Sequence, residues 1–176
     1  MQFTIILFAM FSLSSCGYNK IVELEESANK QWGQVESAYQ RRADLMPKLL
    51  AQAELIGGNH KSKINAAMEK ANIKLSVDDL KDSKKIQEYQ DLQGKVDDLV
   101  NDYLKQIQSD PAMQQSATDL RAQLEGAENR IRFERKKFNE SASEFNAYIR
   151  KVPQNFTSGV MGFDEMAYFE AKQGAR

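Results

Sequence analysis

Residues 113–149 read MQQSATDLRAQLEGAENRIRFERKKFNESASEFNAYI, and this stretch decides the fold. Its apolar side chains recur at steps of three, four and seven residues, which places them on one face of an α-helix. They are Met113, Ala117, Leu120, Leu124, Ala127, Ile131, Phe138, Ala142, Phe145 and Ile149. At about 1.5 Å per residue such a helix reaches roughly 60 Å. Asp110-Pro111 suits its N-terminal cap and Pro153 its end, so the sequence predicts one long amphipathic helix between them.

Three further stripes of helical periodicity precede this one, over residues 21–56, 64–75 and 86–107. Pro47 lies inside the first stripe, and its missing N–H and bulky ring predict a kink or a break near residues 43–47. Gly57 and the glycine after it end that stripe. None of the four helices is apolar all round, so each must bury its stripe against another. The sequence therefore predicts an all-α fold, an elongated antiparallel bundle of about four helices.

The composition is that of long solvated helices, with 28% charged residues and few glycines or prolines among 176 residues. A formal net charge of −1 argues against a general nucleic-acid-binding protein, which usually carries a basic excess. Charge is nevertheless uneven: residues 78–102 hold eight acids against four lysines, and residues 130–137 hold five bases against one acid. This asymmetry predicts that the third and fourth helices lie side by side, with the arginines of one along the acids of the other.

The N-terminus has the layout of a bacterial lipoprotein signal. An apolar run over residues 3–11 precedes Leu13-Ser14-Ser15-Cys16, and Cys16 is the only cysteine in the chain. The run is shorter than the roughly 20 apolar residues of a membrane-spanning helix. No Lys or Arg precedes it, so a plain secretory signal or an anchor stays an alternative. We expect removal of residues 1–15, a lipid on Cys16, and attachment on the periplasmic side of the inner or outer membrane.

Several short motifs that follow one another along the mature chain resemble a single protein family. They are Tyr18-Asn19, WGQVE at 32–36, RRADLMP at 41–47, ENRI at 128–131, Arg135, the heptad-spaced Phe138-Asn139 and Phe145-Asn146, Pro153, Gly162-Phe163 and Tyr168-Phe169-Glu170. In this order they resemble the LemA family. The resemblance implies a membrane-associated helical bundle that faces away from the cytoplasm, and it adds little about mechanism. The expected organisation is a signal over 1–15, a bundle over 16–152 and an aromatic tail over 153–176.

Arg42 interrupts the apolar stripe of the first helix, between Tyr39 and Met46. An arginine that faces a core needs a buried partner of opposite charge. Glu128, in another motif of the resemblance, is the expected partner, which makes a structural ion pair the favoured interpretation. The alternative is that Arg42 contributes to a ligand-binding site.

Ordinary catalytic and metal-binding motifs do not stand out. His60 is the only histidine, and the only thiol is the one expected to carry lipid, so neither a zinc site nor a nucleophile is indicated. No glycine-rich phosphate loop opens a helix, and no cofactor is expected. The favoured function is a non-enzymatic scaffold or adaptor in the cell envelope, bound to the membrane and to a protein partner. A carboxylate-based enzyme or small-molecule carrier is the alternative.

The tail after Pro153 carries several aromatic residues: Phe156, Phe163, Tyr168 and Phe169. Two interpretations stay open. In the first, which we favour, the tail packs back onto the end of the bundle. In the second, it forms an exposed patch that contacts a partner or the membrane.

Overall fold

The architecture comes from a computed structural model, which describes the backbone of residues 2–56 and 59–170 and the side chains of residues 17–51 and 59–170. Within these ranges all regular secondary structure is helical, and this confirms the all-α prediction. The elements are α1 (Gln2–Ala43), α2 (Met46–Ile56), α3 (His60–Ala71), the 3-10 helix η1 (Asp78–Lys81), α4 (Ser83–Ile107), α5 (Gln114–Ile149) and α6 (Gln154–Met161).

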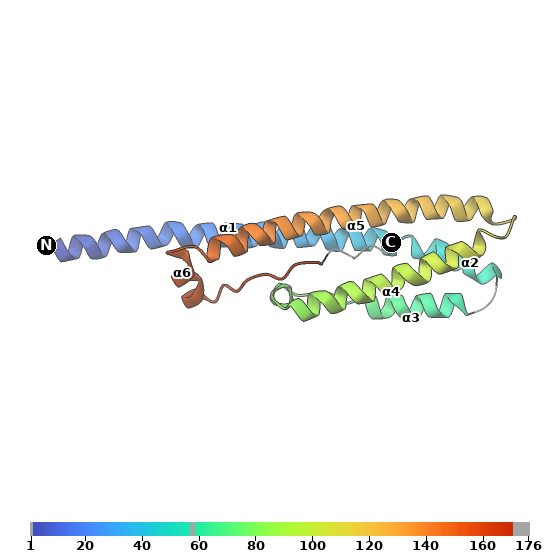
Figure 1. Cartoon of the computed structure of the whole chain (residues 1–176), viewed down its shortest axis with the longest axis horizontal. Coiled ribbons are helices and arrows are strands. Elements are labelled where there is room, and N and C mark those ends of the chain that lie inside the picture. Colours follow the sequence, from blue (N-terminus) through green and yellow to red (C-terminus); the bar gives the residue numbers. More distant parts are fainter. Residues whose placement is uncertain (1, 57–58, 171–176) are drawn as a thin grey trace.

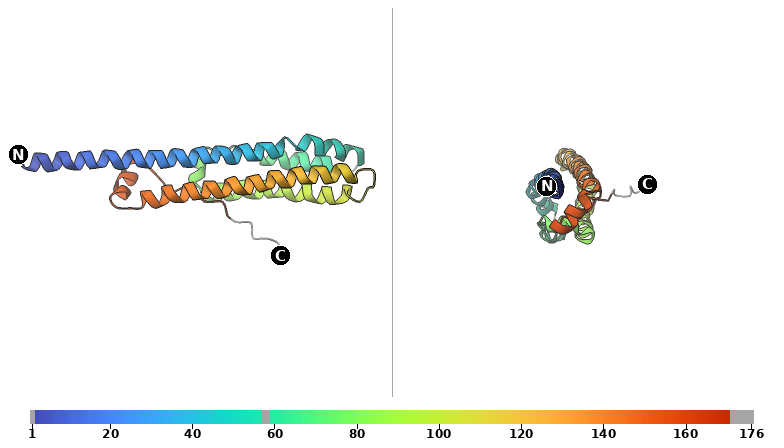
Figure 2. Two further views of the ribbon diagram at one scale, coloured as in Figure 1. Left: turned by 90° about the horizontal axis from the view of Figure 1, so that it is seen from above. Right: turned by 90° about the vertical axis from the view of Figure 1, so that its left-hand side faces the viewer.

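The helices form an elongated antiparallel bundle, as the sequence predicts (Figures 1 and 2). The two longest helices, α1 and α5, pack against each other, and α3 packs on α4. The first part of α1 projects alone beyond the rest of the rod (Figure 1). The pairing that charge asymmetry predicts, α4 with α5, is a minor contact. Arg130 of α5 bonds to Glu134 of the same helix at 2.6 Å.

The helix breaks follow local sequence signals. Helix α1 ends at Ala43 and α2 begins at Met46, so the predicted break lies just before Pro47. Pro47 is the second residue of α2, where its missing N–H leaves no helical hydrogen bond unmade. Helix α2 ends at Ile56, directly before the two glycines.

The start of α5 and the tail differ from expectation. Helix α5 begins at Gln114, because Asp110 forms a turn first: its Oδ1 accepts a hydrogen bond from the N–H of Ala112 at 2.9 Å. The tail contains a helix that the sequence did not predict, α6, which ends at Gly162 in a left-handed conformation with φ of 76°. Glycine adopts that conformation without the steric cost that a β-carbon brings.

Two apolar clusters form the core of the rod. One joins α1, α4 and α5 to the tail, and an aromatic group lies at its centre, where the ring of Trp32 lies 5.7–5.9 Å from those of Tyr89, Phe138 and Phe169. The other joins α2, α3, α4 and α5. Tyr39 of α1 belongs to the first cluster, and Met46, the first residue of α2, belongs to the second.

Candidate binding groove

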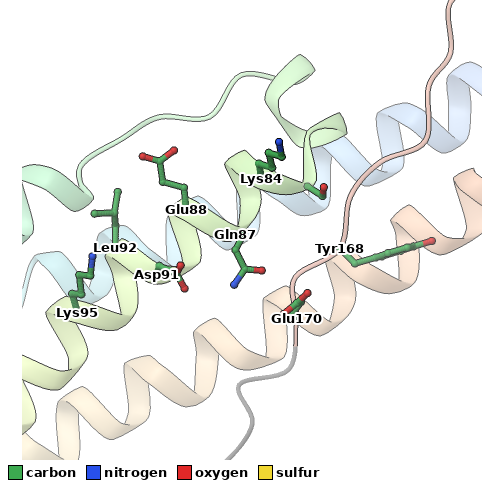
Figure 3. Close-up of a pocket in the computed structure, with 9 residues that line it drawn as sticks. Lys84, Gln87, Glu88, Asp91, Leu92, Lys95, Tyr168 and Glu170 are labelled. Carbon is green, nitrogen blue, oxygen red and sulfur yellow. The ribbon is translucent and has the colours of Figure 1, made fainter.

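The chain from Phe163 to Glu170 is extended and lies in the seam between α4 and α5 (Figure 3). Its backbone is held by amide side chains of those helices. Asn146, which is fully buried, accepts a hydrogen bond from the Met166 N–H at 2.8 Å. Its Nδ2 donates to the Met166 carbonyl at 2.8 Å and to the Tyr168 hydroxyl at 2.9 Å. This single side chain therefore satisfies both backbone polar groups of Met166.

The same arrangement is repeated further along the tail. Asn139 accepts from the Phe169 N–H at 2.9 Å and donates to the Phe169 carbonyl at 2.8 Å. From α4, Gln90 accepts from the Glu170 N–H at 3.2 Å and donates to its carbonyl at 2.9 Å. Arg135 also donates to that carbonyl at 2.9 Å. We call Asn146, Asn139 and Gln90 the amide clamps, because each one accepts a hydrogen bond from the backbone N–H of one tail residue and donates one to the carbonyl of the same residue.

The spacing of the clamps matches the geometry of an extended peptide. Asn139 and Asn146 are seven residues apart, which is about 10.5 Å along a helix. Met166 and Phe169 are three residues apart, which is about 10 Å along an extended chain. Two turns of helix therefore span about the same length as three extended residues, which lets both asparagines reach the tail.

The two Phe-Asn pairs of α5 now have a structural explanation. Phe138 and Phe145 are fully buried in the core, while the asparagine after each one turns toward the tail. From the sequence these pairs served only as family motifs, and their role in holding the tail was missed. The available signal was an amide beside each buried phenylalanine, repeated after two helical turns.

Beyond the tail, a groove of about 990 Å³ continues between α4 and α5. It begins at Phe169 and Glu170 and extends along Asp97, Asp98 and Asn101 of α4. From α5 its walls include Glu128, Arg132 and Ser143. Asp97 lies seven residues after the clamp Gln90, and Arg132 lies seven residues before the clamp Asn139. Polar groups thus recur along the groove at the spacing of the clamps.

Arg42 lies against the wall of this groove and is only 5% exposed. Its two terminal nitrogens donate to the Asp97 carboxylate and to the Gln93 amide oxygen. Gln93 in turn donates to the Ala71 carbonyl at 2.8 Å, and the guanidinium lies 5.2 Å from the Tyr39 ring centroid.

The ion-pair partner expected from the sequence was Glu128, whereas the carboxylate bonded to Arg42 is that of Asp97. Gln93 and Asp97 are one turn apart on α4, so their oxygens present two acceptors that fit the forked guanidinium. Glu128 is a wall residue of the same groove on α5.

The LemA family model matches residues 31–176, which include all three clamps, the clamped tail and Arg42. The chain belongs to the LemA family. No curated protein matches it.

Two tyrosines beside the groove of this LemA protein are held neutral. Burial raises the pKa of Tyr39 and of Tyr89 above the ordinary value of 10.0. Arg42 acts in the opposite direction on both pKa values but does not outweigh burial. Neither phenol is therefore suited to act as a base near neutral pH.

A second hollow of about 510 Å³ lies on the other side of the tail, against α4 (Figure 3). One wall is formed by Tyr168 and Glu170 of the tail. The other wall is formed by α4 and consists mainly of long exposed side chains: Ser83, Lys84, Gln87, Glu88, Asp91, Leu92 and Lys95. They include two lysines and two acids, so this hollow presents a surface of mixed charge rather than a focused site.

The remaining candidates from the sequence lie away from the groove. The His60 ring lies 5.5 Å from that of Tyr103, at the far end of the rod. Among the described side chains, no cluster of three or more histidines, cysteines or acids is arranged to hold a metal ion. Within the same residues, no helix is long and apolar enough to cross a bilayer. The side chain of Cys16 lies outside the described residues.

Proposed function

We propose that this LemA-family protein is a lipid-anchored, non-enzymatic scaffold of the cell envelope, and that the α4/α5 groove binds an extended segment of a partner protein. The observation that carries the proposal is the clamped tail: the walls of this seam already bind the backbone of three residues of the protein's own chain, Met166, Phe169 and Glu170. Helix faces that recognise peptide units in this way depend little on the side chains of the bound segment.

The charge of the groove indicates the charge of the segment that it binds. Six carboxylates line the groove, those of Asp97, Asp98, Glu128, Glu140, Glu144 and Glu170, against the three bases Arg132, Arg135 and Lys136. Carboxylates therefore outnumber bases along the groove. A segment with Lys or Arg side chains fits these walls best, because complementary charge favours the correct partner and repels acidic ones.

The membrane anchor of the proposal rests on Leu13-Ser14-Ser15-Cys16. Cells fed an alkyne fatty acid should label the wild-type protein, and Cys16→Ala should lose the label and the membrane attachment. Equal labelling of both proteins would contradict lipidation at this cysteine.

A photo-crosslinking amino acid at Asn101, inside the groove, tests the binding role in intact cells. The expected result is an adduct with an envelope protein that disappears in Asp98→Lys, where a positive charge enters the acidic wall. Asp102→Lys is the matched control, because Asp102 is exposed on the same helix and is not a wall residue. An adduct that survives Asp98→Lys, or that both variants weaken equally, would contradict the proposed groove.

The carboxylate-based enzyme or small-molecule carrier makes a different prediction for the same residues. A partner that recognises charge should tolerate Glu128→Asp, which keeps the charge and moves it by about one methylene, roughly 1.5 Å. Catalysis depends much more strongly on position, and misplacement of about 1 Å costs on the order of 100-fold in rate. Loss of the cellular phenotype in Glu128→Asp, with the crosslink preserved, would favour the enzyme.

A further inference from the structure

Helix α6 turns an apolar face to solvent. Val152, just before the helix, is 75% exposed, Phe156 is 71% exposed and Val160 is 84% exposed. These three residues follow one another at intervals of four, and Met161 beside them is 60% exposed. The opposite side of the helix is the packed one: Ser158 is buried and donates to the Ile149 carbonyl at 3.3 Å. Four of the large exposed apolar side chains of the described chain are therefore gathered on ten residues.

The position of α6 in the rod is as informative as its composition. It packs on α1 and α5 at the point where α1 leaves the bundle (Figure 1). A β-carbon placed on Gly17 would lie 4.0 Å from Cγ of Gln154, and the Tyr18 ring lies 5.9 Å from that of Phe163. Helix α6 thus lies level with the residues directly after Cys16.

We propose that the exposed face of α6 lies in the headgroup region of the lipid bilayer to which the N-terminus is anchored. This inference rests on the membrane anchor of the proposed function and assigns a second contact with the same bilayer. It holds for either form of the N-terminus, since a lipid on Cys16 and an apolar helix over residues 3–11 both bring Gly17 to the membrane surface.

The orientation of α6 fits such a contact. The helix runs across the long axis of the rod, whereas α1 runs along that axis (Figures 1 and 2). With the start of α1 pointing at the membrane, α6 lies roughly parallel to the membrane surface. Short helices of this kind bury their apolar face about 5–10 Å into the boundary between headgroups and acyl chains.

Charged residues around the helix are compatible with this placement. Lys151 directly precedes Val152 and is exposed, while Arg150 lies 3.8 Å from Glu165 in an exposed ion pair. A lysine at this position is able to contact anionic headgroups while the apolar side chains enter the bilayer. A second copy of the chain would also cover the apolar face, but it would not explain why that face lies at the anchored end.

The test uses full-length protein reconstituted into vesicles of phosphatidylethanolamine and phosphatidylglycerol, with bromine on part of the acyl chains. In Phe156→Trp, contact with the bilayer should shift the emission of the new indole to the blue, and bromine should quench it. Phe133→Trp is the matched control: Phe133 is 47% exposed on α5, and it lies 16 residues, about 24 Å, from the end of α5 next to α6. Its emission should be unaffected by bromine. The native Trp32 is buried and serves as a constant background.

Adding Val160→Ser to Phe156→Trp should reduce the quenching, and because Val160 is exposed the fold is preserved. Protein that sediments with the vesicles while Phe156→Trp is not quenched would overturn this inference and leave the anchor intact. A blue-shifted emission without quenching would show that protein, such as a second copy, covers the face. Protein that does not sediment with the vesicles would overturn both the anchor and the contact.

Discussion

Replacing Asn146 by alanine should release the tail from the bundle. The side chain is fully buried and makes three hydrogen bonds, two to the backbone of Met166 and one to the Tyr168 hydroxyl. Each bond contributes about 0.5–1.5 kcal/mol net, and the Met166 N–H left buried without a partner costs about 1–3 kcal/mol. If the tail stays in place, these contributions lower the free energy of unfolding of Asn146→Ala by about 2.5–7.5 kcal/mol.

Detachment of the tail sets an upper limit on that loss. Met166 is 2% exposed and Phe169 is 4% exposed, and exposing two such side chains costs about 1.5–3 kcal/mol each, in addition to the hydrogen bonds that Asn139, Gln90 and Arg135 make to the tail. The bonds lost in the variant are concentrated at Met166, so the tail should open locally from there rather than strain the whole bundle. Amides of residues 166–170 should then lose most of their protection from hydrogen exchange, while amides in the middle of α5 keep theirs.

Asn155→Ala is the control for this experiment. Asn155 is exposed on α6, so its truncation should change the free energy of unfolding by less than about 0.5 kcal/mol. Denaturant unfolding and hydrogen exchange measured on both variants separate the two cases. If Asn146→Ala retains wild-type protection over residues 166–170, the clamp does not hold the tail and the peptide-binding argument fails with it.

Two further predictions concern charged groups. Arg42→Ala should lower the free energy of unfolding by about 3–5 kcal/mol, because it removes one member of the buried ion pair between Arg42 and Asp97. The exposed Arg41→Ala should lose less than about 0.5 kcal/mol, and equal denaturation midpoints would show that Arg42 is solvated. A hydrogen bond from Lys85 lowers the pKa of Asp79 from 3.8 to about 2, so its contribution to stability is present above pH 3.8 and disappears toward pH 2. The stability difference between wild type and Asp79→Asn should shrink over that interval, and a difference independent of pH would contradict the assignment.

The sequence was sufficient for the features that local rules control. Apolar periodicity predicted the long helices, and Pro47 predicted the break between α1 and α2, because helix geometry and the missing proline N–H act within a few residues. Charge patterning was a poor guide to helix pairing. Exposed ion pairs contribute only about 0–1 kcal/mol each, so burial of the apolar stripes placed α5 on α1 instead.

The groove could not be predicted because its polar residues take partners from distant parts of the chain. In the sequence, Asn139 and Asn146 are ordinary polar residues beside an apolar stripe. Their role depends on contacts with the tail, which lies 20 to 30 residues further along the chain. Arg42 was correctly identified as an unusual residue in the stripe of α1. Its partner depended on whether a carboxylate of α4 or of α5 faced it, and an apolar stripe specifies a buried face without identifying the helix that covers it.

The length of α1 sets the distance between the two proposed contacts, that of α6 with the bilayer and that of the α4/α5 groove with a partner. Gly17 of α1 lies beside α6, and Arg42 lies 25 residues further along the same helix, about 37 Å away. With α6 on the bilayer, the wall of the groove formed around Arg42 stands at about that height above the membrane surface. The clamped tail runs from the α6 end toward Arg42, so residues 163–170 join the membrane contact to the groove. Loss of the clamps would therefore release the tail from the groove without detaching the protein from the bilayer. For this reason hydrogen exchange at residues 166–170 reports on the groove, and lipid quenching at Phe156 reports independently on the membrane contact.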